Sequence, residues 1–248
     1  MPAVQRGPTT ALAACTLLLA GLDVTVGLDP LGWGVGLASL AVVSVVLGLA
    51  LVRHGRDGLR PADRVTLTRA VLACGVAALT ADSFGRPAPV TILVSLAVVA
   101  LALDLVDGQV ARRTGTASAL GARFDMEVDA FLVLVLSVYV ARSAGMWVLA
   151  IGAARYLLLV AARLLPWLRG ETPPRYWCKV VAATQGVVLV VATADVLPHP
   201  VVDAGLVAAT GLLAESFGRQ VRWLWRHRDL VEPARAPLPD LRRAEMTT

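Results

Sequence analysis

The chain has 248 residues, of which 57% are apolar and 17% are charged, and its mean hydropathy is +0.70. Soluble domains carry about 25% charged residues, so this composition excludes an ordinary water-soluble domain and indicates a protein that lies mostly in a bilayer. The net charge is +5, but the basic residues fall in short breaks between apolar runs rather than on one soluble face. This distribution argues against nucleic-acid binding.

Apolar stretches of about 18 residues or more, separated by short polar breaks, are typical of membrane helices. Eight such spans are predicted in chain order: Ala11–Leu28, Leu31–Val52, Val65–Ala81, Val90–Val110, Val128–Ala141, Met146–Leu165, Val180–Leu197 and Val201–Phe217. The fifth apolar run is short, and we expect residues Gly121–Val128 to extend it as helix toward the water. The predicted fold class is therefore an all-α, polytopic membrane helix bundle.

The basic residues alternate from break to break along the chain. With the N-terminus in the cytoplasm, the outer breaks hold only Arg86 and Arg142. The inner breaks hold the others: Arg53, Arg56, Arg60 and Arg64; Arg112, Arg113 and Arg123; Arg169, Arg175 and Lys179; and Arg219, Arg222, Arg226 and Arg228. This asymmetry predicts a multi-pass protein of the cell (plasma) membrane with both termini in the cytoplasm.

Four aspartates have a helical spacing that places them on two facing surfaces. Asp104 and Asp107 lie three residues apart, on one face of the fourth span. Gly121, Asp125 and Asp129 recur every four residues on one face of the next helix. Because a short break joins these two helices, we expect them to be adjacent and antiparallel, with the four carboxylates aimed at one another on the cytoplasmic side.

Some carboxylates of such a cluster would stay protonated unless cations neutralised them. A charge placed deep in a membrane helix costs roughly 2.5–3.5 kcal/mol, and four carboxylates would also repel one another. Hard oxygen ligands in this number suit Mg²⁺ or Mn²⁺, and shared carboxylates can bridge two ions. Gly108, Ala111 and Gly121 remove side-chain bulk, so a ligand can approach the backbone beside the aspartates, and Arg112 offers a planar fork for phosphate.

These residues match a known motif at each defined position: Asp104, Asp107, Gly108, Ala111, Arg112, Gly121, Asp125 and Asp129. The chain thereby resembles the CDP-alcohol phosphotransferase (CDP-alcohol phosphatidyltransferase) family. The resemblance implies a core of six membrane helices from Val65 to about Arg226, preceded by two additional N-terminal transmembrane helices. We divide the chain accordingly into an N-terminal helix pair with its connector (1–60), a six-helix catalytic membrane domain (61–228) and a disordered cytoplasmic tail (229–248).

The resemblance also implies roles for the motif residues. Asp104, Asp107, Asp125 and Asp129 would bind two divalent ions, Mg²⁺ or Mn²⁺, and Asp129 would also be the base for the acceptor hydroxyl. Gly108, Ala111, Arg112 and Gly121 would hold the CDP moiety. The family often has an Asn-x-x-Thr-x-x-Arg stretch before the first core helix, and this chain has Asp63, Thr66 and Arg69 at those positions.

Asp63 and Thr66 are accordingly candidates for nucleotide contacts. An N-cap for the helix after Pro61 is the alternative for Asp63. The implied activity is transfer of a phosphatidyl group, or another substituted phosphate, from CDP-diacylglycerol to an alcohol. CMP would be released, in phospholipid biosynthesis, and a homodimer is expected by resemblance. The alternative function is a cation- or proton-coupled transporter, because intramembrane carboxylates also bind or relay cations. No second copy of the Asp-rich motif, as an inverted repeat would require, occurs in the sequence.

Two further cations are candidate acceptor-binding residues. Arg155 lies near the middle of the sixth span, where a charge requires either a function or an acidic partner. Lys179 either binds the acceptor or extends to the membrane interface as an anchor. Together with Arg163 and Arg175 they favour an anionic acceptor such as a phosphorylated polyol, although the same residues could simply anchor helices.

Overall fold

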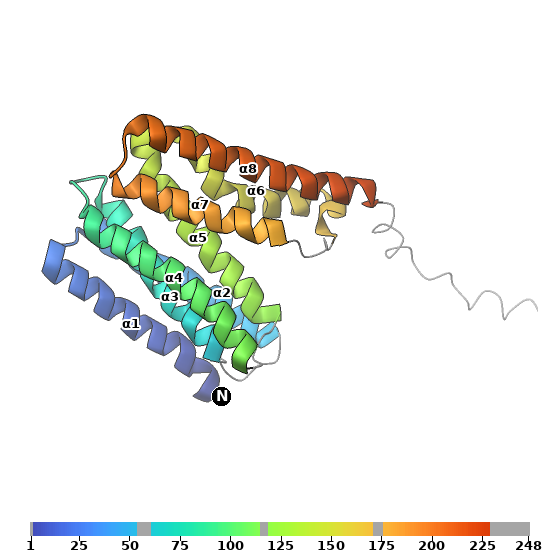
Figure 1. Ribbon diagram of the computed structural model, residues 1–248. Helices are drawn as coiled ribbons and strands as arrows, with labels where there is room; N and C mark the ends of the chain where they lie inside the picture. The colour runs from blue at the N-terminus through green and yellow to red at the C-terminus, as the bar shows by residue number, and fades with distance from the viewer. Residues whose placement is uncertain (1, 54–60, 115–118, 171–175, 229–248) are drawn as a thin grey trace, which may run out of the picture.

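The computed structural model describes residues 2–53, 61–114, 119–170 and 176–228, with side chains described in 10–48, 63–104, 106, 121–165, 167–168, 170 and 177–228. This part of the chain forms α-helices and two short 3₁₀ helices, and no strand occurs in it (Figure 1). The elements are α1 (Pro2–Val26), α2 (Pro30–Arg53), α3 (Pro61–Asp82), α4 (Val90–Thr114), α5 (Ala119–Ala144), η1 (Met146–Val148), α6 (Leu149–Leu164), η2 (Pro166–Arg169), α7 (Tyr176–Ala194) and α8 (His199–Arg226).

The eight predicted helices are present in the predicted order. Helix α5 begins at Ala119, which confirms that the short apolar run after Val128 is extended as helix at its N-terminal side. Helix α8 continues nine residues past Phe217, to Arg226. The predicted apolar span ended at Phe217, because an apolar run marks the length inside the bilayer and not the length of the helix. The six-helix core expected by resemblance ended at about Arg226, where α8 ends.

Helix α3 is the most enclosed helix of the bundle. It packs against α1, α2, α4 and α5, and 83% of its Asp63–Asp82 span is buried, compared with 22% of the Pro30–Gly48 span of α2. The two N-terminal helices therefore cover a face of α3 that would otherwise meet lipid. Most residues of this span of α3 are therefore held by neighbouring helices.

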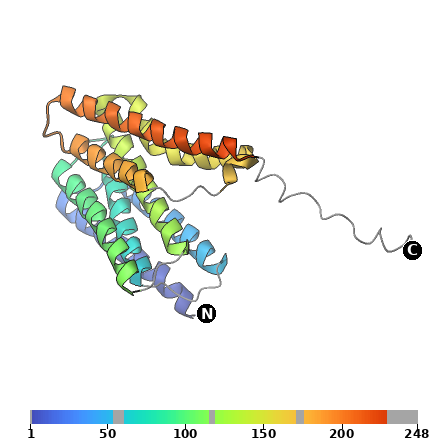
Figure 2. The ribbon, with the colours of Figure 1, turned by 45° about the vertical axis from the view of Figure 1, so that its right-hand side comes forward.

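Helix α5 joins the two halves of the bundle. It contacts α3 on one side and α6 and α7 on the other. Figures 1 and 2 show α1 to α4 grouped together, with α6, α7 and α8 on the far side of α5. Because α5 carries Asp125 and Asp129, these residues lie where the two halves meet.

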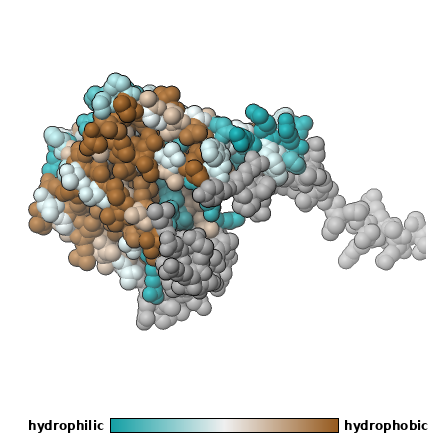
Figure 3. All heavy atoms as spheres, in the orientation of Figure 1, coloured by the Kyte–Doolittle hydropathy of each residue, from teal (hydrophilic) through white to brown (hydrophobic). Residues whose placement is uncertain are grey.

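The outer surface is suited to lipid. Within the described residues, five helices are long and apolar enough to cross a membrane: α2, α3, α6, α7 and α8. The other three helices are 25 or 26 residues long and pack in the same bundle. Exposed apolar side chains include Leu17, Val42, Leu157 and Val207. Hydrophobic residues cover most of the left part of the face in Figure 3, and hydrophilic residues gather where α8 ends. The predicted polytopic membrane helix bundle is confirmed.

A polar cluster ties three helices together at the end of α3 away from the motif. The Asp82 carboxylate is 1% exposed, accepts a hydrogen bond from the backbone N–H of Asp29 at 2.9 Å and pairs with Arg86 at 2.5 Å. Arg142, near the end of α5, donates to Ser83 Oγ at 2.5 Å. These contacts fix α2 and α5 to the end of α3.

One glycine sets the close approach of α5 and α6. A Cβ atom at Gly152 would lie 2.5 Å from Leu134 Cα and 2.9 Å from Ser137 Oγ, so the two helices must separate to accept it. We expect Gly152→Ala to destabilise the bundle by roughly 1–3 kcal/mol, which thermal unfolding in detergent measures. Gly211→Ala on α8 is the control, because nothing lies within 4 Å of a Cβ there. Equal stability of the two variants would show that α5 and α6 do not pack in this way.

Candidate functional site

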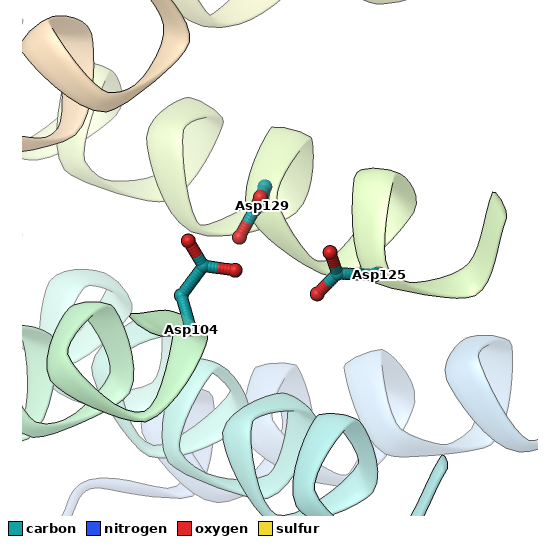
Figure 4. Close-up of side chains that lie close together, drawn as sticks. All are labelled: Asp104, Asp125 and Asp129. Atoms are coloured by element: carbon teal, nitrogen blue, oxygen red, sulfur yellow. The ribbon is translucent and has the colours of Figure 1, made fainter. Parts of the chain in front are cut away.

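Three carboxylates converge between α4 and α5. Asp104 projects from α4, and Asp125 and Asp129, one turn apart on α5, point toward it (Figure 4). One oxygen from each of the three carboxylates lies within 4.8 Å of the others. Helices α3 and α7 each pack against both α4 and α5, which holds the facing carboxylates in register.

A buried arginine from a third helix contacts all three carboxylates. Arg69 Nη1 lies 3.0 Å from Asp104 Oδ1 and also pairs with Asp125 Oδ1, while Nη2 pairs with Asp129 Oδ1. Arg69 Nε donates to the backbone carbonyl of Ala100 on α4 at 3.1 Å. A single guanidinium thus connects α3 to α4 and α5.

Exposure differs sharply between the two sides of this cluster. The Arg69 side chain is 1% exposed, whereas those of Asp104, Asp125 and Asp129 are 36%, 33% and 37% exposed. The arginine therefore lies behind the carboxylates, and a ligand can reach the carboxylates from the other side. Among the described side chains of the cluster, three carboxylates and one guanidinium give an excess of two negative charges.

The predicted nucleotide residues on α3 lie close to this cluster along the helix. Asp63 and Thr66 precede Arg69 by six and three residues, so the three share one helix face, and each is no more than 2% exposed. Asp63 lies in the first turn of α3, which begins at Pro61. Gly121 lies one turn before Asp125 on α5.

Four other predicted site residues lie on α4. The backbone of α4 runs through Asp107, Gly108, Ala111 and Arg112, but the side chains of these residues lie outside the described part of the chain. The fourth metal ligand and most of the CDP-binding set therefore remain predictions.

The two candidate acceptor residues lie outside the carboxylate cluster. Arg155 Nη2 pairs with Glu127 Oε1 at 2.5 Å, so this charge on α6 has the acidic partner that its position demands. Glu127 lies two residues from both Asp125 and Asp129, which turns it toward α6 instead of the cluster. Lys179 is exposed in the first turns of α7.

Arg69 is a site residue for which the sequence alone predicted no role. The motif Asp63-x-x-Thr66-x-x-Arg69 contains it, but its partners come from two helices distant in sequence. One signal was available: an arginine in an apolar span is costly unless it is paired, and the next two helices carry Asp104, Asp125 and Asp129.

The carboxylate cluster fits a divalent cation. Mg²⁺ binds oxygen at 2.0–2.1 Å, so oxygens on opposite sides of one ion are about 4.2 Å apart. The 4.8 Å limit on the carboxylate oxygens is within a small side-chain adjustment of that span. Each carboxylate contacts Arg69 through Oδ1, and a carboxylate has a second oxygen with which to bind a cation.

Comparison with known families gives one match. The family model described as CDP-alcohol phosphatidyltransferase matches residues 60–215, which is more than half of the chain and includes Arg69 and all the motif aspartates. The comparisons with curated proteins and with solved structures gave no match. The family implies a transferase that moves a substituted phosphate group from a CDP-alcohol to an alcohol acceptor, and its members use divalent metal. With these residues matched over this length, the chain belongs to the CDP-alcohol phosphatidyltransferase family.

Proposed function

We propose that this protein transfers the phosphatidyl group of CDP-diacylglycerol to an alcohol and releases CMP, as a step of phospholipid biosynthesis. The observation that carries the proposal is the convergence of Asp104, Asp125 and Asp129 within a chain of this family. The exposed apolar surface of the bundle supports a donor whose lipid tails stay in the bilayer.

Asp104, Asp125 and Asp129, together with Asp107, are the proposed ligands of two divalent ions, Mg²⁺ or Mn²⁺. When bound, such ions neutralise a diphosphate and stabilise the leaving CMP. The excess of two negative charges around Arg69 supports cation binding at this place. Asp107 follows Asp104 by three residues on α4, so helical geometry puts it on the same face.

Asp129 is the proposed base. It accepts the proton of the acceptor hydroxyl, whose oxygen attacks the phosphorus that bears the diacylglycerol, while the bond to the CMP phosphate breaks. Its support is its place in the cluster, deeper along α5 than Asp125 and paired with Arg69. A base held by a fixed guanidinium has a defined orientation toward the attacking hydroxyl.

The CDP moiety is proposed to lie beside Gly108, Ala111, Arg112 and Gly121. Gly121 is one turn from Asp125, at the end of α5 that faces the break between α4 and α5. On α3, Asp63 and Thr66 share a helix face with Arg69 and are proposed to contribute nucleotide contacts.

Arg155 and Lys179 are the proposed acceptor-binding residues, for an acceptor that is itself anionic, such as a phosphorylated polyol. Arg155 supports this only in part, because Glu127 already neutralises it. If Arg155 binds the acceptor, the Glu127 pair orients its guanidinium. If it does not, the pair is a structural link between α5 and α6.

The orientation of the protein follows the distribution of its basic residues. The motif end of α4 and α5 is proposed to face the cytoplasm at the plasma membrane, with both chain termini on that side. The Arg-rich end of α8, with Arg219 and Arg226, and its tryptophans Trp223 and Trp225 support a cytoplasmic interface there.

The experiment that tests this function uses purified protein with CDP-diacylglycerol, Mg²⁺ or Mn²⁺ and a panel of acceptors. The panel holds glycerol phosphate, inositol phosphate, free inositol and serine. We expect release of CMP together with a phosphatidyl alcohol identified by mass, and faster reaction with the phosphorylated acceptors. Absence of CMP release with every acceptor would contradict the proposed donor. Equal rates with free and phosphorylated polyols would contradict the proposed acceptor class alone.

A further inference from the structure

The position of Arg69 behind the carboxylates is fixed from two directions. Its Nε–H is held by the Ala100 carbonyl, and α3, which carries it, is enclosed by four helices. The guanidinium cannot leave the carboxylates without breaking this buried hydrogen bond and exposing its charge to an apolar interior. Arg69 is therefore a permanent part of the cluster and not a side chain that moves aside for a ligand.

The three carboxylates of the cluster repel one another when they are ionised, and the positive charge of Arg69 offsets this repulsion. Three carboxylates from α4 and α5 cannot remain ionised and close together in a helix bundle unless positive charge lies among them. Bound divalent ions would supply that charge, but only while they are bound. The Nη atoms of Arg69 reach all three carboxylates and are present whether or not an ion is bound.

We propose that Arg69 is a positioning residue that acts as a built-in counter-cation. It holds Asp104, Asp125 and Asp129 together while no divalent ion is present, and it stays behind them when an ion binds. The stability of the bundle thereby becomes largely independent of metal, and the ligand set is already assembled when metal and nucleotide arrive. This inference rests on the metal site of the proposed function.

The test compares thermal unfolding of wild type and Arg69→Gln, each in EDTA and in saturating Mg²⁺. Removing one partner of a buried ion pair costs about 3–5 kcal/mol, which corresponds to a fall in Tm of roughly 10 °C for a chain of this size. We expect Arg69→Gln to show that loss in EDTA and to recover most of it in Mg²⁺, because the ion then replaces the missing charge. Wild type is expected to remain folded in EDTA.

Arg86→Gln is the matched control. Arg86 also pairs with a buried aspartate, Asp82, but at the opposite end of α3. The fall in Tm caused by Arg86→Gln is expected to be the same in EDTA and in Mg²⁺. Arg69→Lys, which keeps a charge but not the fork that reaches three carboxylates, is expected to fall between wild type and Arg69→Gln in EDTA.

The outcomes separate this inference from the function on which it rests. An equal loss for Arg69→Gln with and without Mg²⁺, or no loss at all, overturns the role of Arg69. If Arg69→Gln does not fold in either buffer, the fall in Tm of Arg69→Lys is compared between EDTA and Mg²⁺ instead. An equal fall in both buffers then overturns the role of Arg69. The metal site is tested separately, by Mn²⁺ binding to wild type followed by electron paramagnetic resonance. If wild type binds no Mn²⁺, the metal site itself is wrong, and the proposed function fails with it.

Discussion

Replacement of Asp129 by Asn is expected to lower the rate of CMP release by about 1,000-fold, the usual contribution of a positioned general base. The amide keeps the size of the side chain but cannot accept the hydroxyl proton, and it removes one charge from the three-carboxylate cluster. The rate is measured as CMP formed from CDP-diacylglycerol at saturating Mg²⁺ and acceptor, so that weaker metal binding does not limit it.

Asp203→Asn is the control for this change. Asp203 is exposed near the start of α8, away from the carboxylate cluster, and its replacement is expected to leave the rate unchanged. Transfer by Asp129→Asn at the wild-type rate would contradict the assignment of the base while leaving the metal ligands untested by this experiment.

Removal of divalent metal is expected to have an effect at least as large. The diphosphate of the donor is anionic, and Arg69 already contacts the three carboxylates. Loss of one electrostatic donor to a transition state costs about 100- to 1,000-fold, and a divalent ion contributes more charge than one donor. We therefore expect chelation by EDTA to lower CMP release by at least about 1,000-fold.

The control for chelation is addition of excess Mg²⁺ or Mn²⁺ to the same sample. Recovery of the initial rate shows that EDTA acted by removing the ion and that the protein stayed folded. CMP release that continues in EDTA at the untreated rate would mean that transfer in this chain does not depend on a divalent cation.

The helical spacing of the aspartates explains why much of the site could be predicted from the sequence. Asp125 and Asp129 share a face because they are four residues apart, whatever the rest of the bundle does. Asp104 on α4 was expected to face them because only a short break separates α4 from α5 in the sequence, and Figure 4 shows that it does. The membrane class and the order of the helices follow equally from runs of apolar residues, because a bilayer imposes a minimum length on each.

The role of Arg69 could not be predicted in the same way. Its contacts depend on how α3 packs against α4 and α5, which local spacing does not determine. The burial of α3 by α1 and α2 could not be predicted for the same reason, because it too depends on how the helices pack. An apolar helix that faces lipid and one that faces another helix have similar compositions, so the sequence could not show that the N-terminal pair covers α3.

The partners of the charged residues Asp82 and Arg155 could not be predicted from the sequence either. Asp82 directly follows the apolar span Val65–Ala81, and in the structure it is 1% exposed and binds Arg86 and the backbone at the start of α2. Arg155 was predicted to require either a function or an acidic partner. The identity of its partner, Glu127, depends on how closely α5 approaches α6 at Gly152.

Binding of Mn²⁺ to purified protein without nucleotide, followed by electron paramagnetic resonance, tests the central claim most directly. Wild type and Asp203→Asn are expected to bind Mn²⁺ saturably and with the same affinity. Asp104→Asn and Asp125→Asn, which each remove one carboxylate from the cluster, are expected to bind it roughly 100-fold more weakly. Unchanged Mn²⁺ affinity in both of these variants would contradict a cation site between α4 and α5.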